Sequence, residues 1–223
     1  MIVVAVPVKD LVNAKQRLTP LLTPQERSLL ARAMLHDVLR ALAGSALAEA
    51  WVITGDDEVE AIAREHAVHA LREKANRGHT AAVALAQAEA RRAGADTFLT
   101  VPGDVPCVTT AEIDALAMAA RGRMASAVFA ASRSGLGTNG VALAPADAMP
   151  LTFGEPSFAN HVALARARGL TTSVLALRGL ALDVDTPDDL ESLLTENVDS
   201  ETGRLVASWR LGDRTTGVAL TRS

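Results

Sequence analysis

The feature that most constrains the fold of this chain is a sustained alternation of short β-branched runs with helical stretches. The first run, Ile2–Val8, is apolar almost throughout, which is typical of a strand buried on both faces of a parallel sheet. The next stretch opens with Thr23-Pro24-Gln25-Glu26, a capping box with proline at the first helical position, and keeps a helical apolar stripe until Gly44. Repeated strand–helix units predict an α/β fold in which helices cover an open, largely parallel sheet.

The same alternation continues for most of the chain. Strands are predicted at 50–54, 68–71, 97–101, 125–131, 141–144 and 172–177, and residues 180–182 are expected to be extended. Helices are predicted at 56–66, 80–94 and 157–169, with two more beginning after Thr109 and Thr186. Residues 1–194 are therefore expected to form one domain.

The last residues, 195–223, differ in composition, being rich in Thr, Ser, Gly and charge. They are expected to form either a strand-bearing extension or a loosely ordered tail. The fragment Leu205–Trp209 could pair with a sheet edge or with a second copy of the chain, which would make the protein a homodimer.

Composition narrows the class of protein further. Aromatic residues make up only 3% of the 223 residues and tyrosine is absent, so Ala, Val and Leu must fill the interior by packing helices on a sheet. A net charge of −4 argues against a general nucleic-acid surface. A single cysteine, Cys107, excludes an internal disulfide and a thiolate metal site. Because no apolar run reaches the roughly 20 residues that span a bilayer and no signal peptide is evident, we expect a cytoplasmic protein that does not enter membranes.

In open parallel sheets, ligands gather at the carboxyl ends of the strands, so we expect the functional residues in the loops there. The loop after the first strand carries Lys9, Lys15 and Arg17, three cations within nine residues. Such side chains suit a polyphosphate, because lysine offers a point charge and arginine a bidentate fork. A solvated basic loop would explain the same pattern equally well.

Aspartates follow two of the predicted extended segments. Asp104, in the loop Pro102–Pro106, stands on a rigid turn after a strand, where a carboxylate can bind Mg²⁺ together with substrate phosphates. Asp183 and Asp185 also lie at an element boundary and could face the same ion. The alternative for this second pair is the acidic start of a helix, where the helix dipole favours negative charge.

Two further segments could accept an anion. Ser134–Gly140 is rich in glycine, which lets backbone N–H groups approach a ligand closely. Phe153–Phe158 places a glycine and the Ser157 hydroxyl just before a helix N-terminus, although Ser157 could also be a plain N-cap. The five histidines are scattered and are expected to have surface or core roles, and no zinc site is predicted. The motifs of P-loop NTPases, α/β-hydrolases and dinucleotide-binding dehydrogenases are missing.

Taken in order, these segments resemble the guanylyltransferase family that makes the diphosphate precursor of coenzyme F-420. The resemblance covers roughly residues 2–194 and rests on Val6–Lys9 with Ala14–Leu18, Pro102–Pro106, Gly137–Asn139, Phe153–Phe158 and Leu182–Pro187. It implies a three-layer αβα, Rossmann-like nucleotide-diphospho-sugar-transferase fold with a mostly parallel mixed sheet. It also implies transfer of GMP from GTP to a small phosphorylated carboxylic acid, namely phosphoenolpyruvate, 2-phospholactate or 3-phosphoglycerate, with release of pyrophosphate.

The resemblance also implies residue roles. Asp104 and Asp183 would bind Mg²⁺, with Asp185 in reserve. Lys9, Lys15 and Arg17 would surround the triphosphate and act in catalysis with Asp104. The acceptor would contact Thr138, Gly154 and Ser157, and the nucleotide would also contact Gly78 and Thr80.

This chain departs from the family where Gly78–Val83 replaces the usual Gly-Leu-Asn-Ala-Ala-Leu. A hydroxyl thus stands in place of an amide at Thr80, which bears on the contact to the base or ribose. Two other functions are compatible with the same pattern. One is another nucleotidyltransferase of this fold, acting on a sugar phosphate or a pterin cofactor, and the other is a non-catalytic nucleotide-binding protein.

Overall fold

The computed structural model describes residues 1–122, 124–196 and 200–211. A seven-stranded sheet with the order β3-β2-β1-β4-β6-β5-β7 forms its centre. Its strands are β1 (Ile2–Pro7), β2 (Glu49–Thr54), β3 (His69–Arg72), β4 (Thr97–Thr100), β5 (Ser126–Ala131), β6 (Thr138–Ala144) and β7 (Thr171–Val174). β6 runs antiparallel to its neighbours β4 and β5, and the other pairings are parallel. The predicted mostly parallel mixed sheet is therefore confirmed.

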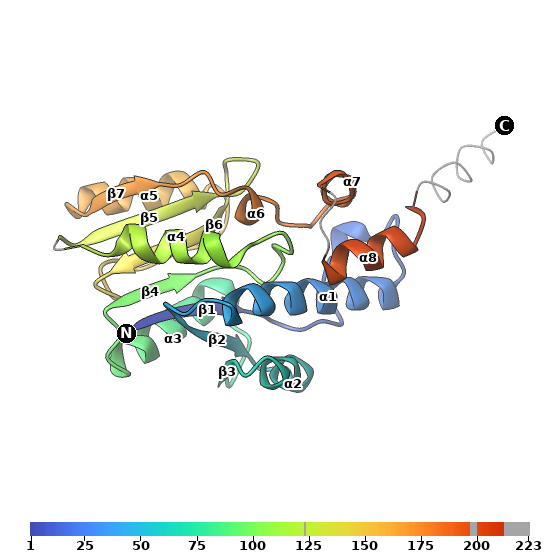
Figure 1. The fold of residues 1–223 in the computed structure, drawn as a ribbon, viewed down its shortest axis with the longest axis horizontal. Helices are drawn as coiled ribbons and strands as arrows, with labels where there is room; N and C mark the ends of the chain where they lie inside the picture. The colour runs from blue at the N-terminus through green and yellow to red at the C-terminus, as the bar shows by residue number, and fades with distance from the viewer. Residues whose placement is uncertain (123, 197–199, 212–223) are drawn as a thin grey trace.

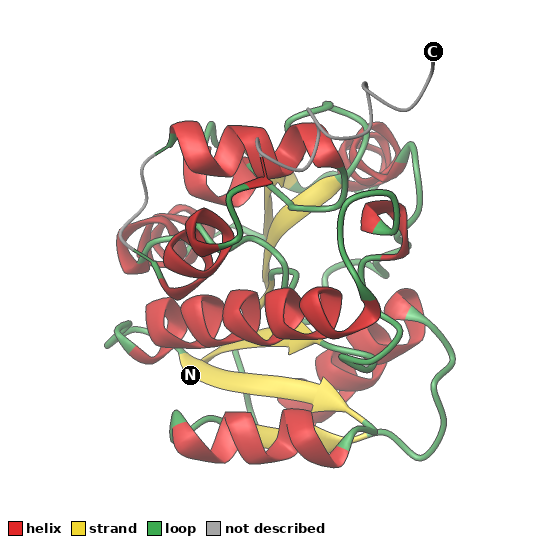
Figure 2. Ribbon diagram, turned by 90° about the vertical axis from the view of Figure 1, so that its right-hand side faces the viewer, coloured by secondary structure: helices red, strands yellow, loops and turns green. Residues whose placement is uncertain are grey.

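Helices cover both faces of this sheet, as Figures 1 and 2 show. The helices are α1 (Pro24–Ala43), α2 (Asp57–Glu65), α3 (His79–Arg92), α4 (Thr110–Ala120), α5 (Ser157–Ala167), α6 (Arg178–Ala181), α7 (Pro187–Thr195) and α8 (Glu201–Ser208), with a 3-10 turn, η1 (Gln16–Leu18). One apolar core joins the sheet to α1, α2 and α4, and a second core on the opposite face joins it to α3 and α5. The three-layer αβα prediction is confirmed.

Local signals account for several element boundaries. At the start of α1, the Thr23 hydroxyl accepts a hydrogen bond from the Glu26 amide, while the Glu26 carboxylate accepts one from the Thr23 amide. Thr109 and Glu112 form the same reciprocal pair at the start of α4. Each pair satisfies amides that a helix end would otherwise leave without partners, which is why the sequence predicted both starts correctly.

Several predicted boundaries are wrong; the strand predicted at 172–177, for example, ends at Val174. The strand predicted at 141–144 begins at Thr138, because residues 138–140 pair with the end of β5 and are buried there. Residues 180–182, expected to be extended, partly belong to the short helix α6. In α6 the Gly179 amide donates to the Glu112 carboxylate, so a partner on α4 favours the helical turn.

The C-terminal segment contains a helix where the sequence suggested a strand. α8 includes most of Leu205–Trp209 and packs against α1 (Figure 1). Its first amides, from Glu201 and Thr202, donate to the buried carboxylate of Asp37 on α1. The prediction that this fragment could pair with a sheet edge is therefore wrong. Residues 197–199 and 212–223, which belong to the same predicted extension, lie outside the described residues.

The topology brings one set of loops to a single edge of the sheet. β1, β2, β4 and β5 run parallel to one another, so their carboxyl ends and the amino end of antiparallel β6 share that edge.

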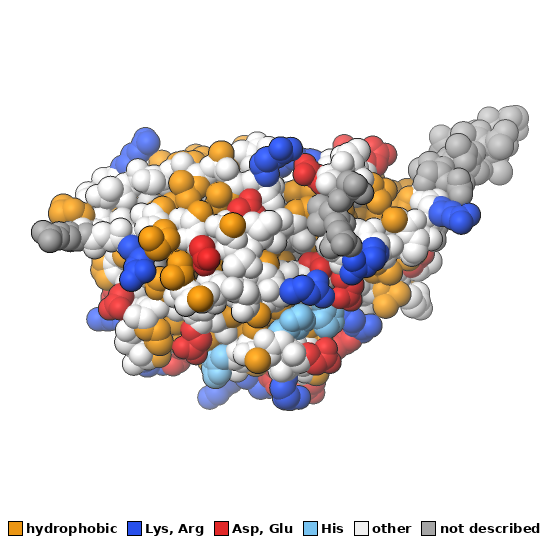
Figure 3. All heavy atoms as spheres, in the orientation of Figure 1, with side chains coloured by type: hydrophobic (Ala, Val, Ile, Leu, Met, Phe, Trp, Pro, Cys, Tyr) orange, Lys and Arg blue, Asp and Glu red, His pale blue; other side chains and the backbone are white. Residues whose placement is uncertain are grey.

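On the face that carries α1 and α4, acidic and basic side chains are interspersed (Figure 3). Among the described helices, each is too short or too polar to cross a membrane.

Candidate active site

Asp104 lies in the loop after β4, at the edge where the strand carboxyl ends meet. Gly103 lets this loop pack closely on β1, because a Cβ there would lie 3.1 Å from the Val8 side chain. The backbone carbonyl of Asp104 accepts a hydrogen bond of 3.0 Å from the amide of Val184. The loop after β4 is thereby fastened to the segment that carries Asp183 and Asp185.

Lys15 joins these two segments through its side chain. Its Nζ lies 2.7 Å from Asp104 Oδ2 and 2.7 Å from Asp185 Oδ1, and its side chain is only 7% exposed. Burial disfavours the charged ammonium, but the two carboxylates outweigh it and raise the pKa of Lys15 above 10.5. Lys15 also adopts a left-handed backbone conformation with φ of 55°, which is uncommon for a residue with a side chain.

Asp183 is held from the other side by Asn139 on β6. The Asn139 amide donates 2.9 Å hydrogen bonds to the Asp183 carboxylate and to the Leu180 carbonyl. Burial raises the pKa of Asp183, and the nearby charges of Asp104 and Asp185 raise it further, while the Asn139 hydrogen bond opposes them. The three aspartates therefore interact electrostatically at one place.

The donor set suits a divalent cation of the magnesium type. Carboxylate oxygens are hard ligands, and Mg²⁺ is usually bound by one or two carboxylates together with substrate phosphates and water. Within the described residues, no group of three or more His, Cys, Asp or Glu side chains is arranged to hold a metal ion by itself. Asp104 and Asp183 thus fit an ion that arrives with its phosphate ligands, and Mg²⁺ binding by these two residues stays a prediction.

The predicted cations Lys9, Lys15 and Arg17 do not form one compact cluster. Lys9 and Lys15 line a small hollow together with Gly103 and Asp104. Arg17 instead lines a neighbouring cleft of about 300 Å³, together with Asp183, Asp185 and five other residues. Lys15 contacts one aspartate of each hollow, Asp104 and Asp185, so the three cations are divided between two hollows that Lys15 connects.

The predicted nucleotide-side residues Gly78 and Thr80 lie at the start of α3. Gly78 has φ of 93°, and the Thr80 hydroxyl accepts a 2.9 Å hydrogen bond from the Phe153 amide. Next to them, the ring of His79 packs edge-on against Phe153, with 4.4 Å between ring centroids. Burial lowers the pKa of His79, and the charge of Asp104 opposes this. The start of α3 is thereby tied to the segment predicted to bind the acceptor.

Two of the predicted acceptor residues are in direct contact. Thr138 Oγ1 at the start of β6 lies 3.1 Å from Ser157 Oγ and 3.0 Å from His161 Nδ1. Ser157 is the first residue of α5, and the N-cap position is taken by Pro156, so the alternative of Ser157 as N-cap is wrong. Gly154, in the loop just before Ser157, has a positive φ of 118°, which a residue with a side chain rarely adopts.

The sequence predicted no individual role for Asn139, His79 or His161, although Asn139 and His79 lie within predicted binding segments. His161 lies four residues after Ser157 on α5, and side chains at this spacing share one face of a helix. That spacing was available in the sequence and could have drawn attention to His161. Asn139 and His79 acquire their positions only through contacts with distant segments.

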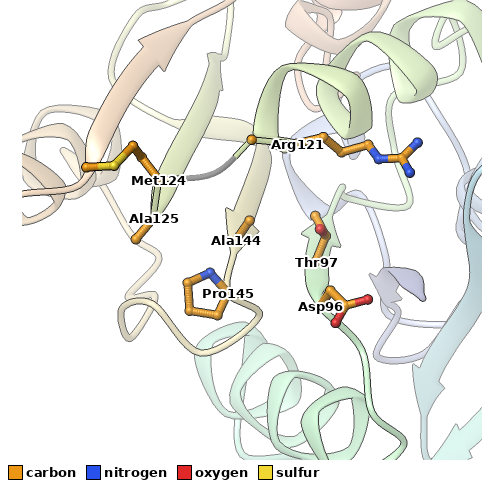
Figure 4. Close-up of a pocket in the computed structure, with 8 residues that line it drawn as sticks. Asp96, Thr97, Arg121, Met124, Ala125, Ala144 and Pro145 are labelled. Carbon is orange, nitrogen blue, oxygen red and sulfur yellow. The ribbon is translucent and has the colours of Figure 1, made fainter.

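Another hollow, of about 320 Å³, lies at the opposite edge of the sheet (Figure 4). Its lining includes Asp96 and Thr97 at the amino end of β4 and Ala144 at the end of antiparallel β6. Since the three aspartates and Lys15 lie at the other edge, this hollow does not belong to the candidate active site.

Comparison with curated proteins relates the chain to guanylyltransferases. It is 42% identical over 193 residues to the phosphoenolpyruvate guanylyltransferase of Sphaerobacter thermophilus, covering 86% of this chain and 91% of the relative. It is 36% identical to the 2-phospho-L-lactate guanylyltransferase of Methanothermobacter thermautotrophicus, covering 85% and 82%. It is 35% identical to the 3-phospho-D-glycerate guanylyltransferase of Phenylobacterium zucineum, covering 79% and 82%.

The fold is also similar to that of solved structures. A proposed nucleotide-diphospho-sugar transferase from Desulfovibrio desulfuricans matches with a TM-score of 0.75 at 18% identity, covering 93% of this chain and 94% of that one. The family model described as "Guanylyl transferase CofC like" matches residues 2–212, which include every segment of the candidate site. Because these matches extend over most of its length, this chain belongs to the CofC-like guanylyl transferase family.

Proposed function

We propose that this protein transfers GMP from GTP to a small phosphorylated carboxylic acid, with release of pyrophosphate, in the biosynthesis of coenzyme F-420. The relatives named above carry the names of three acceptors: phosphoenolpyruvate, 2-phospholactate and 3-phosphoglycerate. Phosphoenolpyruvate is the first acceptor to test, because the relative named for it is the most identical of these three.

Two groups at the same end of the sheet support this proposal: Asp104, Asp183 and Lys15, and the Thr138–Ser157 pair. They are linked through Asn139, which follows Thr138 in the chain and donates a hydrogen bond to Asp183. The aspartates and Lys15 provide charges suited to a triphosphate and its cation. Thr138 and Ser157 provide hydroxyl groups suited to the phosphate or carboxylate of the acceptor.

The chemistry requires positioning and charge neutralisation more than proton transfer. A phosphate oxygen of the acceptor forms a bond to the α-phosphorus of GTP, and the bond from the α-phosphorus to the bridging oxygen of the pyrophosphate breaks. Because the acceptor phosphate is already largely ionised at neutral pH, no side chain has to remove a proton from it.

Individual residues would then act as follows. Lys9, Lys15 and Arg17 would neutralise the triphosphate and the departing pyrophosphate. Asp104 and Asp183 would hold Mg²⁺, which when bound withdraws negative charge from phosphate oxygens. Gly78 and Thr80 would form part of the nucleotide side of the site, with the Thr80 hydroxyl shared with the Phe153 amide.

Pyrophosphate release tests the proposal. The purified protein with Mg²⁺ should release pyrophosphate when GTP is combined with one of the three acids, and should release little with GTP alone. CTP in place of GTP tests the rival cytidylyltransferase function. Tight GTP binding without release for any acid would instead favour a non-catalytic nucleotide-binding protein.

Asp104→Ala should abolish this release. A matched control is Asp96→Ala, which removes a carboxylate that is 84% exposed, at the opposite edge of the sheet. The control should keep wild-type activity, because an exposed ion pair contributes little to stability. Equal activity in the Asp104→Ala protein would contradict the proposed role of Asp104.

A further inference from the structure

His161 is buried next to the Thr138–Ser157 pair and contacts the Thr138 hydroxyl. It is 2% exposed, and its ring stacks on Phe129 with 6.0 Å between centroids and meets Phe153 edge-on at 5.1 Å. Both of its ring nitrogens have partners: Nε2 lies 3.0 Å from the Thr152 amide nitrogen, and Nδ1 lies 3.0 Å from Thr138 Oγ1. The ring is therefore fixed in orientation by two aromatic contacts and two hydrogen bonds.

The Thr152 amide determines which ring nitrogen carries the proton. A backbone N–H can only donate, so Nε2 must be an acceptor without a hydrogen. In a neutral imidazole the single hydrogen is then on Nδ1, which donates to Thr138 Oγ1. Burial among uncharged groups keeps the ring neutral, and it lowers the pKa of His161 to about 4.

A count of donors shows what this arrangement does to the two hydroxyls. His161, Thr138 and Ser157 together own three polar hydrogens and are joined by two hydrogen bonds, so one hydroxyl hydrogen is left to point away from the group. With the opposite tautomer there would be only two hydrogens for two hydrogen bonds, and the hydroxyls would offer a ligand nothing but lone pairs. An anionic oxygen needs a donor, so the two tautomers differ in whether they can bind it.

We propose that His161 is a positioning residue whose Nδ1–H orients the Thr138 and Ser157 hydroxyls so that they donate one hydrogen bond to an anionic oxygen of the acceptor. This inference rests on the proposed function, since it assigns the Thr138–Ser157 pair to the acceptor. This inference adds a reason why the pair selects a phosphate or carboxylate. The buried His161 ring, which does not itself touch the ligand, fixes the pair as a hydrogen-bond donor.

The first test needs no activity. ¹⁵N NMR of histidine-labelled wild-type protein, with the His161 signals assigned by comparison with His161→Asn, reports which ring nitrogen is protonated. Protonation of Nδ1 with a bare Nε2 at pH 7 is expected. A proton on Nε2, or a doubly protonated ring, would overturn the inference even if no acceptor is ever found.

The second test separates acceptor binding from nucleotide binding. His161→Phe keeps an aromatic ring but removes both nitrogens, and should raise the KM for the acceptor about 10- to 100-fold, the effect of one hydrogen bond to a charged group. The KM for GTP should be unchanged. His161→Asn keeps an N–H near the Nδ1 position and should recover most of the loss, while His69→Asn, at an exposed histidine on β3, should behave as wild type.

A double variant shows whether His161 acts through Thr138. If it does, adding His161→Phe to Thr138→Val should raise the acceptor KM little further, because the hydroxyl that it orients is already gone. Independent, additive effects would overturn the inference, as would a rise in the KM for GTP equal to that for the acceptor. Wild-type protein that turns over none of the three acids would refute the proposed function, and the NMR result would still decide the tautomer.

Discussion

Acidification should destabilise this protein partly through His161. In the unfolded chain this histidine has its ordinary pKa of 6.5, and burial lowers the pKa to about 4 in the folded protein. Its neighbours Phe129, Phe153, Thr138 and the Thr152 amide carry no charge that could stabilise an imidazolium. Because the folded pKa is depressed, the contribution to stability is complete above pH 6.5 and is lost as the pH falls towards 4.

The magnitude follows from the two pKa values. At about 1.36 kcal/mol for each pKa unit, complete protonation of His161 destabilises the folded state by about 3 kcal/mol relative to the unfolded state. Most of this loss, about 2 kcal/mol, falls between pH 7 and pH 5. That is a large fraction of the 5–15 kcal/mol by which folded domains are typically stable, and it is therefore measurable.

Urea unfolding followed by circular dichroism at pH 7 and pH 5 measures this contribution. Between these pH values the free energy of unfolding of the wild type should fall by about 2 kcal/mol more than that of His161→Phe, because the other titrating groups are common to both proteins. His69→Asn is the control and should show the same pH dependence as the wild type. An equal fall in wild type and His161→Phe would refute the buried neutral state of His161.

Two further predictions concern Lys15 and Asp37. Lys15→Met should lower the rate of pyrophosphate release by about 100- to 1,000-fold, as expected for loss of a preorganised charge at the reacting phosphates. The same variant should bind Mg²⁺ more tightly than wild type in the absence of nucleotide, because no ammonium then lies between Asp104 and Asp185. Titration calorimetry measures this affinity, and an unchanged Mg²⁺ affinity would contradict the prediction. Asp37→Ala should destabilise the fold by about 3 kcal/mol in urea unfolding, because the Glu201 amide and the Thr202 amide and hydroxyl lose a buried charged acceptor. Asp37→Asn keeps one acceptor oxygen and should be less destabilised; equal loss in both variants would contradict the role of these hydrogen bonds.

Local signals explain why most of the fold could be predicted. The capping boxes at Thr23 and Thr109 satisfy backbone amides within four residues, so the helix starts are visible in short windows of sequence. The run Ile2–Pro7 is buried along its whole length, and its apolar composition reflects this. Elements whose stabilising partners are close in the chain were therefore predicted correctly.

The elements that were missed depend on distant partners. α8 begins at Glu201, and the carboxylate that accepts hydrogen bonds from its first amides is Asp37, more than 160 residues earlier in the chain. α6 depends on Glu112, which accepts a hydrogen bond from the Gly179 amide. A Cβ on Gly179 would also clash with the Cys107 carbonyl oxygen, so the close approach of this helix requires glycine. A short window of sequence does not indicate such contacts.

In the candidate site too, the spacing of residues in the sequence indicates some features and not others. Three cations within nine residues predicted a basic loop, but the left-handed turn at Lys15 and the 3-10 turn that follows place Arg17 in a different cleft from Lys9. The spacing therefore indicated a basic loop, and the backbone conformation decides which hollow each cation lines.

The histidines show a further limit of sequence patterns, because a search for motifs tests whether a residue can itself bind a ligand. His161 fits no metal or nucleophile motif, and its four-residue spacing from Ser157 shows only that the two side chains share a helix face. What makes its ring relevant is the direction of one hydrogen bond, from the Thr152 amide to Nε2, since this places the remaining proton on Nδ1 and leaves the two hydroxyls with a hydrogen to donate. Under the proposed role of His161, recognition of the acceptor's charge depends on a backbone amide that does not touch the acceptor. A change in the 151–153 loop that turned this amide away would then weaken acceptor binding without altering any residue of the Thr138–Ser157 pair.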